Sequence, residues 1–267
     1  MWPYLNIFLA AFLWSTIGLA AHFGGDYVWM AILRMGIAAV FTVAAWGPPR
    51  RGGLLPGLLL GGLCTSYLAA AIYAGVGPAA YLLYTAPLWA TAILYTWGER
   101  PSRLDVLGVA LILVAVAMMW TASAAGEINP LGFAAGLAAG IFYGSYIAVA
   151  RRYAKEGREA EASLGAMPYS PLATLPLFAI AKNHVPTLEA TVAGIYLAIF
   201  ATLIPYRLFT SAVTKVSGSK ASVVASMEAV LAALWGVLLL GQTPGIYTTA
   251  AYMLITTAIL LSLKKTT

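Results

Sequence analysis

Basic residues in this chain gather on every second connection between ten apolar segments. Twelve of its 15 Lys and Arg residues lie on these connections. The basic connections contain Arg50–Arg51, Arg100 and Arg103, Arg151 to Arg158, Lys215 and Lys220, and Lys264–Lys265. The connections between them carry one basic residue in total, Lys182. Because cytoplasmic loops of membrane proteins are enriched in Lys and Arg, the alternation predicts a chain with ten membrane spans and with both termini in the cytoplasm.

The composition favours the same class of protein. Hydrophobic residues make up 61% of the chain and charged residues 9%, against about 25% charged residues in a typical soluble domain. So few charges could not cover a soluble surface of this size, whereas a bilayer requires an apolar exterior. The net charge of +6 is then an orientation signal and does not indicate nucleic-acid binding. The single cysteine, Cys64, excludes an internal disulfide and a cysteine metal cluster.

We therefore predict an all-α integral membrane protein, since a helix needs about 20 apolar residues to cross the hydrocarbon core. The start, Met1 to Tyr4, lacks the basic region of a signal peptide, so the first segment is expected to stay as a membrane helix. The seventh segment is interrupted by prolines and is expected to be a kinked helix. The polar stretch 151–161 is expected to be a loop. The ten transmembrane helices are predicted over residues 4–22, 27–46, 54–73, 78–97, 103–121, 131–149, 161–181, 190–209, 219–240 and 245–263.

The two halves of the chain contain related motifs. The fourth segment runs to Gly98-Glu99-Arg100-Pro101, and the ninth runs to Gly241-Gln242-Thr243-Pro244. Each motif is followed by one last apolar segment. We predict a first five-helix repeat over residues 1–126 and a second over residues 127–267. Because five is odd, the second repeat is inverted in the membrane, which is typical of secondary transporters with a substrate site near the midplane.

These features resemble the EamA type of the drug/metabolite transporter superfamily. The resemblance rests on ten helices, the inverted repeat, Pro87 ahead of the Gly98–Pro101 motif, Glu228-Ala229-Val230 in the ninth helix and Arg34 early in the second. It covers the whole chain. It implies a solute carrier, often an exporter of amino acids or related metabolites, whose central cavity is lined by helices one, three, four, six, eight and nine.

The sequence departs from the family pattern at two positions. It has Gln242 where a Glu is usual and Ala229 where a Pro is common. Because Gln242 lies at a helix end, we expect its change to affect a cap or loop contact and not transport itself.

Two ionisable residues in apolar segments are candidates for function. Glu228 is the one carboxylate well inside a predicted span, and such residues are costly in a membrane and commonly functional. It could bind a substrate or a proton; the alternative is a polar lock between helices. Arg34 could pair with Asp26, snorkel to the interface or attract a substrate carboxylate.

The aromatic residues predict the character of the cavity. Aromatic walls with few polar groups suit amphipathic ligands. We expect the cavity to be lined by Trp14, Ser15, Tyr84, Tyr143, Ser226 and Glu228.

A regular glycine row predicts close helix packing. Gly132, Gly136, Gly140 and Gly144 recur at every fourth residue of the sixth segment, and such rows let membrane helices approach closely. We expect these four and Pro87 to be helix-packing positions. A sliding surface during transport is a further hypothesis for the same row.

Several classes of chemistry leave no signature in the sequence. It contains no phosphate-binding Gly-Lys-Ser/Thr loop and no His-Glu-x-x-His motif, so we predict no catalytic residues, metal site or cofactor. Pores usually show rings of charge, and this chain shows none, which argues against a channel.

The sequence therefore predicts a secondary transporter of the plasma membrane that works by alternating access. We expect it to export a small metabolite, with amino acids or related compounds as the first candidates. Its partners are the substrate and the lipid bilayer, with no nucleic acid. Proton coupling, and a monomer or a homodimer, stay open. The alternative function is a flippase of a lipid-linked or amphipathic substrate, which needs a cavity open to the bilayer.

Overall fold

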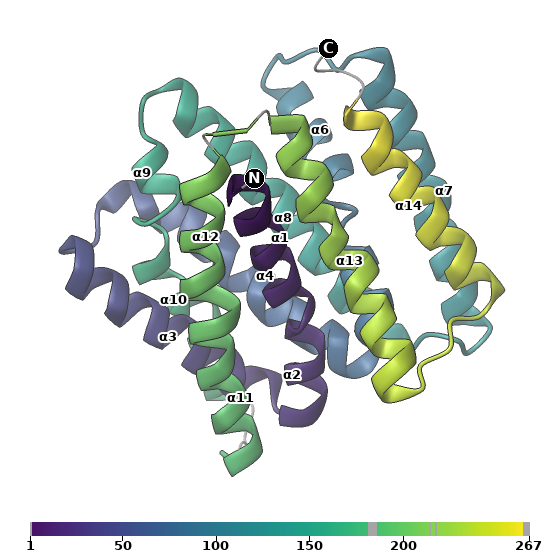
Figure 1. Ribbon diagram of the computed structural model, residues 1–267, viewed down its shortest axis with the longest axis horizontal. Helices are drawn as coiled ribbons and strands as arrows, with labels where there is room; N and C mark the ends of the chain where they lie inside the picture. The colour runs from purple at the N-terminus through teal and green to yellow at the C-terminus, as the bar shows by residue number, and fades with distance from the viewer. Residues whose placement is uncertain (1, 181–185, 214, 217, 264–267) are drawn as a thin grey trace.

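The computed structural model describes residues 2–180, 186–213, 215–216 and 218–263, and over these residues it contains helices and turns but no β-strand (Figure 1). Lys182, Lys264 and Lys265 of the charge pattern, and the end of the seventh predicted helix, lie outside the described residues.

Six helical stretches in the described part of the chain are long and apolar enough to cross a membrane. They are Trp2–Gly24, Tyr27–Trp46, Arg51–Tyr73, Arg103–Ala124, Pro130–Lys155 and Leu188–Ala212. This confirms an all-helical membrane protein. The individual helices are α1 (Trp2–Ser15), α2 (Ile17–Gly24), α3 (Tyr27–Trp46), α4 (Leu54–Tyr73), α5 (Val76–Leu83), α6 (Ala86–Thr96), α7 (Arg103–Ala124), α8 (Pro130–Lys155), α9 (Glu159–Ala162), α10 (Pro171–Ile180), α11 (Leu188–Ala198), α12 (Ile204–Val213), α13 (Gly218–Leu240) and α14 (Ile246–Leu263), with short 3₁₀ turns at Arg51–Gly53 and Met167–Tyr169 and a π-turn at Ile199–Leu203.

The fourth predicted helix is broken into α5 and α6. The break falls at Tyr84–Thr85, directly before the first turn of α6, which contains Pro87. Proline lacks an amide hydrogen, and its ring clashes with the carbonyl four residues earlier, here that of Leu83. The Thr85 hydroxyl donates to the Leu82 carbonyl at 2.7 Å. The prediction of one continuous helix over 78–97 is therefore wrong, and the break places Tyr84 at a helix end.

The seventh segment is also more irregular than predicted. It consists of α9, the 3₁₀ turn Met167–Tyr169 and α10, because Pro168 and Pro171 each remove a backbone donor. A kinked helix over 161–181 is wrong for its first half. The expected loop over 151–161 is wrong as well, since α8 continues to Lys155 and α9 starts at Glu159.

The glycine row of α8 faces α4, α5 and α6. A Cβ added at Gly136 would lie 2.5 Å from Leu82 Cδ1, and one at Gly144 would lie 2.5 Å from the Ala86 carbonyl oxygen. At Gly132 and Gly140 an added Cβ would run into backbone and side-chain atoms of α4 and of the α5–α6 break. Helix α8 therefore lies in backbone contact with the broken helix that carries Tyr84.

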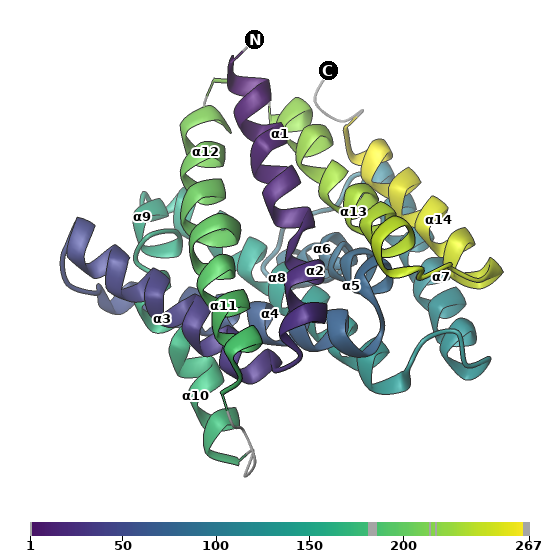
Figure 2. The same cartoon turned by 60° about the horizontal axis from the view of Figure 1, so that its bottom comes forward.

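Helix α8 packs on α4, α5 and α6, and α13 packs on α1 and α5, while α7 and α14 pack side by side at one flank (Figures 1 and 2). The start of α1 and the end of α14 lie at the same end of the bundle (Figure 2).

Candidate functional site

A cavity of about 260 Å³ lies inside the bundle. Its walls come from α1, α2, α3, α4, α5, α8, α12 and α13 and from the α5–α6 break. Seven of the lining side chains are aromatic, and two carry opposite charges. The lining residues are Trp14, Ile17, Arg34, Leu63, Cys64, Tyr67, Leu83, Tyr84, Tyr143, Tyr146, Tyr206, Phe209, Ala225 and Glu228. We call this space the central cavity.

Glu228 on α13 supplies the negative charge of the central cavity. Its side chain is buried, and its Oε2 accepts a hydrogen bond of 3.0 Å from the Tyr84 hydroxyl. The same hydroxyl lies 3.2 Å from the Ala225 carbonyl, so one proton is shared between two acceptors. No described basic side chain lies within ion-pair distance of Glu228. Burial of a carboxylate with one hydrogen bond and no ion pair costs free energy, unless a further donor or cation binds to it.

Arg34 on α3 supplies the positive charge. It is 4% exposed, so it does not snorkel to the interface. Its Nε donates to Thr202 Oγ1 at 2.9 Å and its Nη2 to the Ala201 carbonyl at 3.1 Å. These acceptors belong to the π-turn Ile199–Leu203, and π-turns inside α-helices are frequent at functional sites.

Of the five N–H donors of the Arg34 guanidinium, these two bonds use two. Asp26 caps α3 instead, where it accepts from the amides of Val28 and Trp29 at 3.0 Å. The guanidinium is therefore anchored by two hydrogen bonds, and its other N–H donors are available to a molecule in the central cavity.

Tyr67 on α4 has a hydroxyl that lacks a hydrogen-bond partner among the described residues. The side chain is 2% exposed and lines the central cavity. By contrast, the Tyr146 hydroxyl donates to the Ala162 carbonyl at 2.8 Å. Because buried polar groups are nearly always hydrogen-bonded, the Tyr67 hydroxyl is the group in this wall that most needs an occupant of the cavity.

The residues expected from the sequence are only partly brought together. Trp14, Tyr84, Tyr143 and Glu228 share the central cavity. Ser15 lies outside its lining: the hydroxyl donates to the Phe12 carbonyl at 2.7 Å and accepts from Trp235 Nε1 at 2.9 Å, which joins α1 to α13. Ser226 and Pro87 line a neighbouring space instead.

Sequence reasoning did not select several of the lining residues. They are Tyr67, Tyr146, Tyr206, Phe209 and Cys64, and for Arg34 the sequence allows three roles. The available signal is a tyrosine hydroxyl placed several residues inside a predicted span, which Tyr67 has, whereas Tyr206 lies near the end of its span. No comparable pattern in the sequence predicts the π-turn that anchors Arg34.

The neighbouring space has a volume of about 270 Å³, and we call it the side chamber. It shares Tyr84, Tyr143, Phe209 and Ala225 with the central cavity. Its other walls come from α6, α7, α8, α13 and α14. The remaining lining residues are Ala86, Pro87, Thr91, Leu104, Asp105, Gly108, Val109, Ile112, Ile147, Ser226, Ala258 and Ile259.

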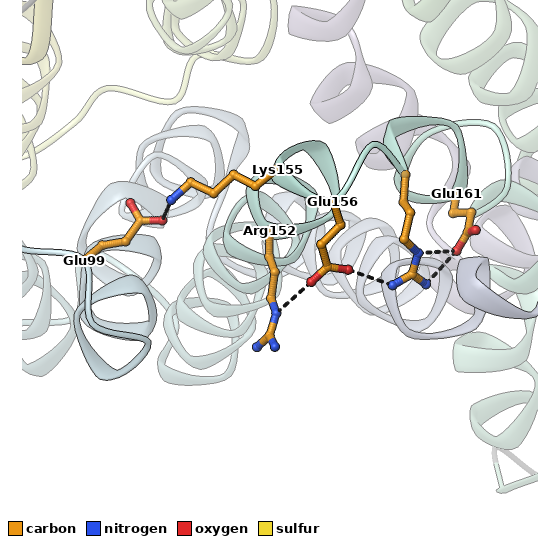
Figure 3. A network of polar contacts seen from close by, with 6 residues as sticks. Glu99, Arg152, Lys155, Glu156 and Glu161 are labelled. Atoms are coloured by element: carbon orange, nitrogen blue, oxygen red, sulfur yellow. Dashed lines mark hydrogen bonds and ion pairs between the residues drawn. The ribbon is translucent and has the colours of Figure 1, made fainter.

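A charged network joins two helix ends on the side of the basic connections. Glu99, just after α6, accepts from Lys155 at 2.5 Å and from Arg151 at 2.9 Å, both at the end of α8 (Lys155 in Figure 3). The hydrogen bonds from Lys155 and then Arg151 lower the pKa of the Glu99 carboxyl. Since the depressed pKa keeps Glu99 ionised, the contact persists at neutral pH and is lost only as the pH falls through that lowered pKa.

The matching motif of the second half makes a different contact. Gln242 Oε1 accepts from the Val76 amide at 2.9 Å, at the first turn of α5. Gln242 therefore caps a helix. An amide can fill this place because the partner is a backbone N–H and not a cation.

Comparison with known proteins identifies the family. The sequence profile of the EamA-like transporter family matches residues 130–264, which is half of the chain. The chain belongs to the EamA-like transporter family. The resemblance noted from its motifs is thus confirmed, and membership makes this chain a membrane transporter of small substrates.

Individual relatives of this EamA-like transporter agree with the assignment. An uncharacterized transporter of Archaeoglobus fulgidus is 27% identical over 242 residues, which cover 89% of this chain and 87% of the relative. A solved crystal structure superposes with a TM-score of 0.64 over 97% of this chain and 96% of the other, at 21% identity. The second likeness concerns the fold alone.

Proposed function

We propose that this EamA-like transporter is a secondary carrier that exports a small metabolite, an amino acid or a related compound, across the plasma membrane by alternating access. The observation that carries the proposal is that Arg34 and Glu228 line one cavity without forming an ion pair with each other.

Two buried charges of opposite sign complement a zwitterion. A substrate carboxylate can accept from the free donors of Arg34, and a substrate ammonium can donate to Glu228. Charge-assisted hydrogen bonds of this kind are roughly twice as strong as neutral ones. The aromatic walls add cation–π attraction for the ammonium, and the Tyr67 hydroxyl offers a third polar contact. A bound amino acid would therefore compensate both charges at once.

The ten-span inverted repeat over residues 1–126 and 127–267 is part of the proposal. The helix contacts support it, because a contact between two helices recurs between their equivalents in the opposite half. Helix α4 packs on α8, and the equivalent pair, α11–α12 with α1–α2, is also in contact. Helix α3 packs on α11 as α10 packs on α4, and α7 packs on its equivalent, α14. The central cavity then lies between the repeats, where such transporters bind substrate.

A binding measurement tests the proposal. Isothermal titration calorimetry on purified protein would compare amino acids with their amides, which lack the carboxylate, and with the corresponding amines. We expect wild-type protein to bind only the zwitterions. Glu228→Gln and Arg34→Gln should each weaken binding at least about tenfold, the effect of ~1.4 kcal/mol.

The controls are Glu189→Gln and Arg207→Gln, which change exposed charges of the same kind. Because Arg34→Gln removes two buried hydrogen bonds and could unfold the protein, the analogue comparison on wild-type protein provides a second test. Equal affinity for an amino acid, its amide and its amine would contradict the proposal.

The second candidate is a flippase of a lipid-linked or amphipathic substrate. The side chamber favours it, because its wall is mostly apolar and includes α7 and α14 at the flank of the bundle. If folded protein binds no amino acid, quaternary amine or sugar but transfers a fluorescent phospholipid between leaflets, this function is the correct one.

A further inference from the structure

The side chamber and the central cavity meet at one partition. Tyr84, Tyr143, Phe209 and Ala225 belong to both linings. The Tyr84 hydroxyl is held by Glu228 and by the Ala225 carbonyl. Tyr84 therefore both contacts the charged Glu228 and lines the side chamber.

Taken together, the two spaces have the volume of a typical small-molecule site. Small-molecule pockets usually measure about 300–1,000 Å³. The central cavity of about 260 Å³ and the side chamber of about 270 Å³ each fall short of this range, and together they lie within it.

The two spaces differ in chemistry. The charges of Arg34 and Glu228 and the Tyr67 hydroxyl, which lacks a partner among the described residues, belong to the central cavity. In the side chamber, Asp105 already accepts from the Ser102 amide at 2.7 Å and from its hydroxyl at 2.9 Å, as part of the cap of α7. Most of the remaining wall is aliphatic, from Leu104 and Ile112 on α7 to Ile259 on α14. Such a wall fits an apolar group and offers little to a charged one.

We propose that the two spaces hold one substrate, with its charged head between Arg34 and Glu228 and an apolar tail that passes Tyr84 into the side chamber. The inference rests on the proposed carrier function and narrows its substrate class to amphipathic zwitterions, such as amino acids with long aliphatic side chains. Burial of the tail would supply affinity that the small polar head lacks.

Filling the side chamber tests the inference. A Cβ added at Gly108 on α7 would meet only the Ala258 carbonyl oxygen, at 3.8 Å, so Gly108→Leu can extend into the chamber. Gly36→Leu on α3 is the matched control, because an added Cβ there meets nothing within 4 Å. The probes are 2-aminobutyrate and 2-aminooctanoate, which have the same head and differ by four methylenes in the tail.

We expect wild-type protein and Gly36→Leu to bind 2-aminooctanoate on the order of a hundredfold more tightly, since each buried methylene contributes roughly a factor of four. Gly108→Leu should lose most of this preference and keep its affinity for 2-aminobutyrate. Gly108→Val provides the same test if the leucine variant does not fold.

The outcomes separate the two proposals. Equal binding of the probes by wild-type protein, or an unchanged preference in the folded Gly108 variant, would overturn the side-chamber inference and leave the carrier function standing. Failure of wild-type protein to bind either probe, or any other amino acid, would overturn the proposed function and this inference with it.

Discussion

At the scale of single residues, two cavity tyrosines differ in how their hydroxyls are used. The Tyr146 hydroxyl donates to the Ala162 carbonyl and ties α8 to α9. The Tyr67 hydroxyl has no partner among the described residues, although its side chain is more deeply buried than that of Tyr146. The first is a structural contact, and we propose that the second contacts a bound substrate.

Replacement of each tyrosine by phenylalanine should separate these roles. Tyr146→Phe leaves the Ala162 carbonyl without its donor and should lower the free energy of unfolding by about 1 kcal/mol. Tyr67→Phe removes an unsatisfied group, so stability should stay the same or rise, while substrate affinity falls. Thermal unfolding in detergent and titration calorimetry measure the two quantities. A destabilised Tyr67→Phe with unchanged affinity would assign the hydroxyl a structural role.

The sequence predicts some cavity residues better than others. Trp14, Tyr84, Tyr143 and Glu228 can be selected because polar or amphipathic side chains well inside an apolar span need a special environment. Ser15 meets the same criterion, yet its hydroxyl is satisfied by Phe12 and Trp235. Whether a hydroxyl faces a cavity or a neighbouring helix depends on tertiary contacts that one sequence does not contain.

At the scale of helices, the contact between α8 and the α5–α6 break should tolerate no added volume. A leucine at Gly140 would drive its Cβ into Thr85 Oγ1 and toward the Leu82 carbonyl oxygen. We expect Gly140→Leu to abolish folding or transport, because backbone atoms cannot move aside as a flexible side chain can. Fluorescence-detected size-exclusion chromatography reports the folded fraction, with Gly36→Leu as the control. Wild-type flux in the Gly140 variant would refute this.

Helix boundaries could be predicted where the chemistry is local. Helices α3 and α4 begin and end at the predicted residues, because Asp26 caps one and prolines 48 and 49 separate them. The sequence does not predict the break at Tyr84 or the turns before α10. Prolines are tolerated inside membrane helices when neighbours satisfy the freed groups, so their effect depends on packing.

At the scale of the whole molecule, the alternation of charge predicts which ends of the helices face the cytoplasm. In a Cys64→Ala background, Ala124→Cys at the end of α7 and Ala154→Cys near the end of α8 both place a thiol at an exposed position. An impermeant maleimide added to intact cells should label the first variant and not the second. The reverse pattern would invert the proposed orientation.

The central claim is that the whole bundle works as a carrier around the Arg34–Glu228 cavity. The most direct measurement is counterflow in proteoliposomes loaded with unlabelled amino acids, with a labelled amino acid outside. A carrier exchanges one for the other, so we predict transient accumulation of label above its outside concentration for a subset of amino acids, with none for Glu228→Gln. Simple equilibration of the label without accumulation, or full accumulation in Glu228→Gln, would contradict this account.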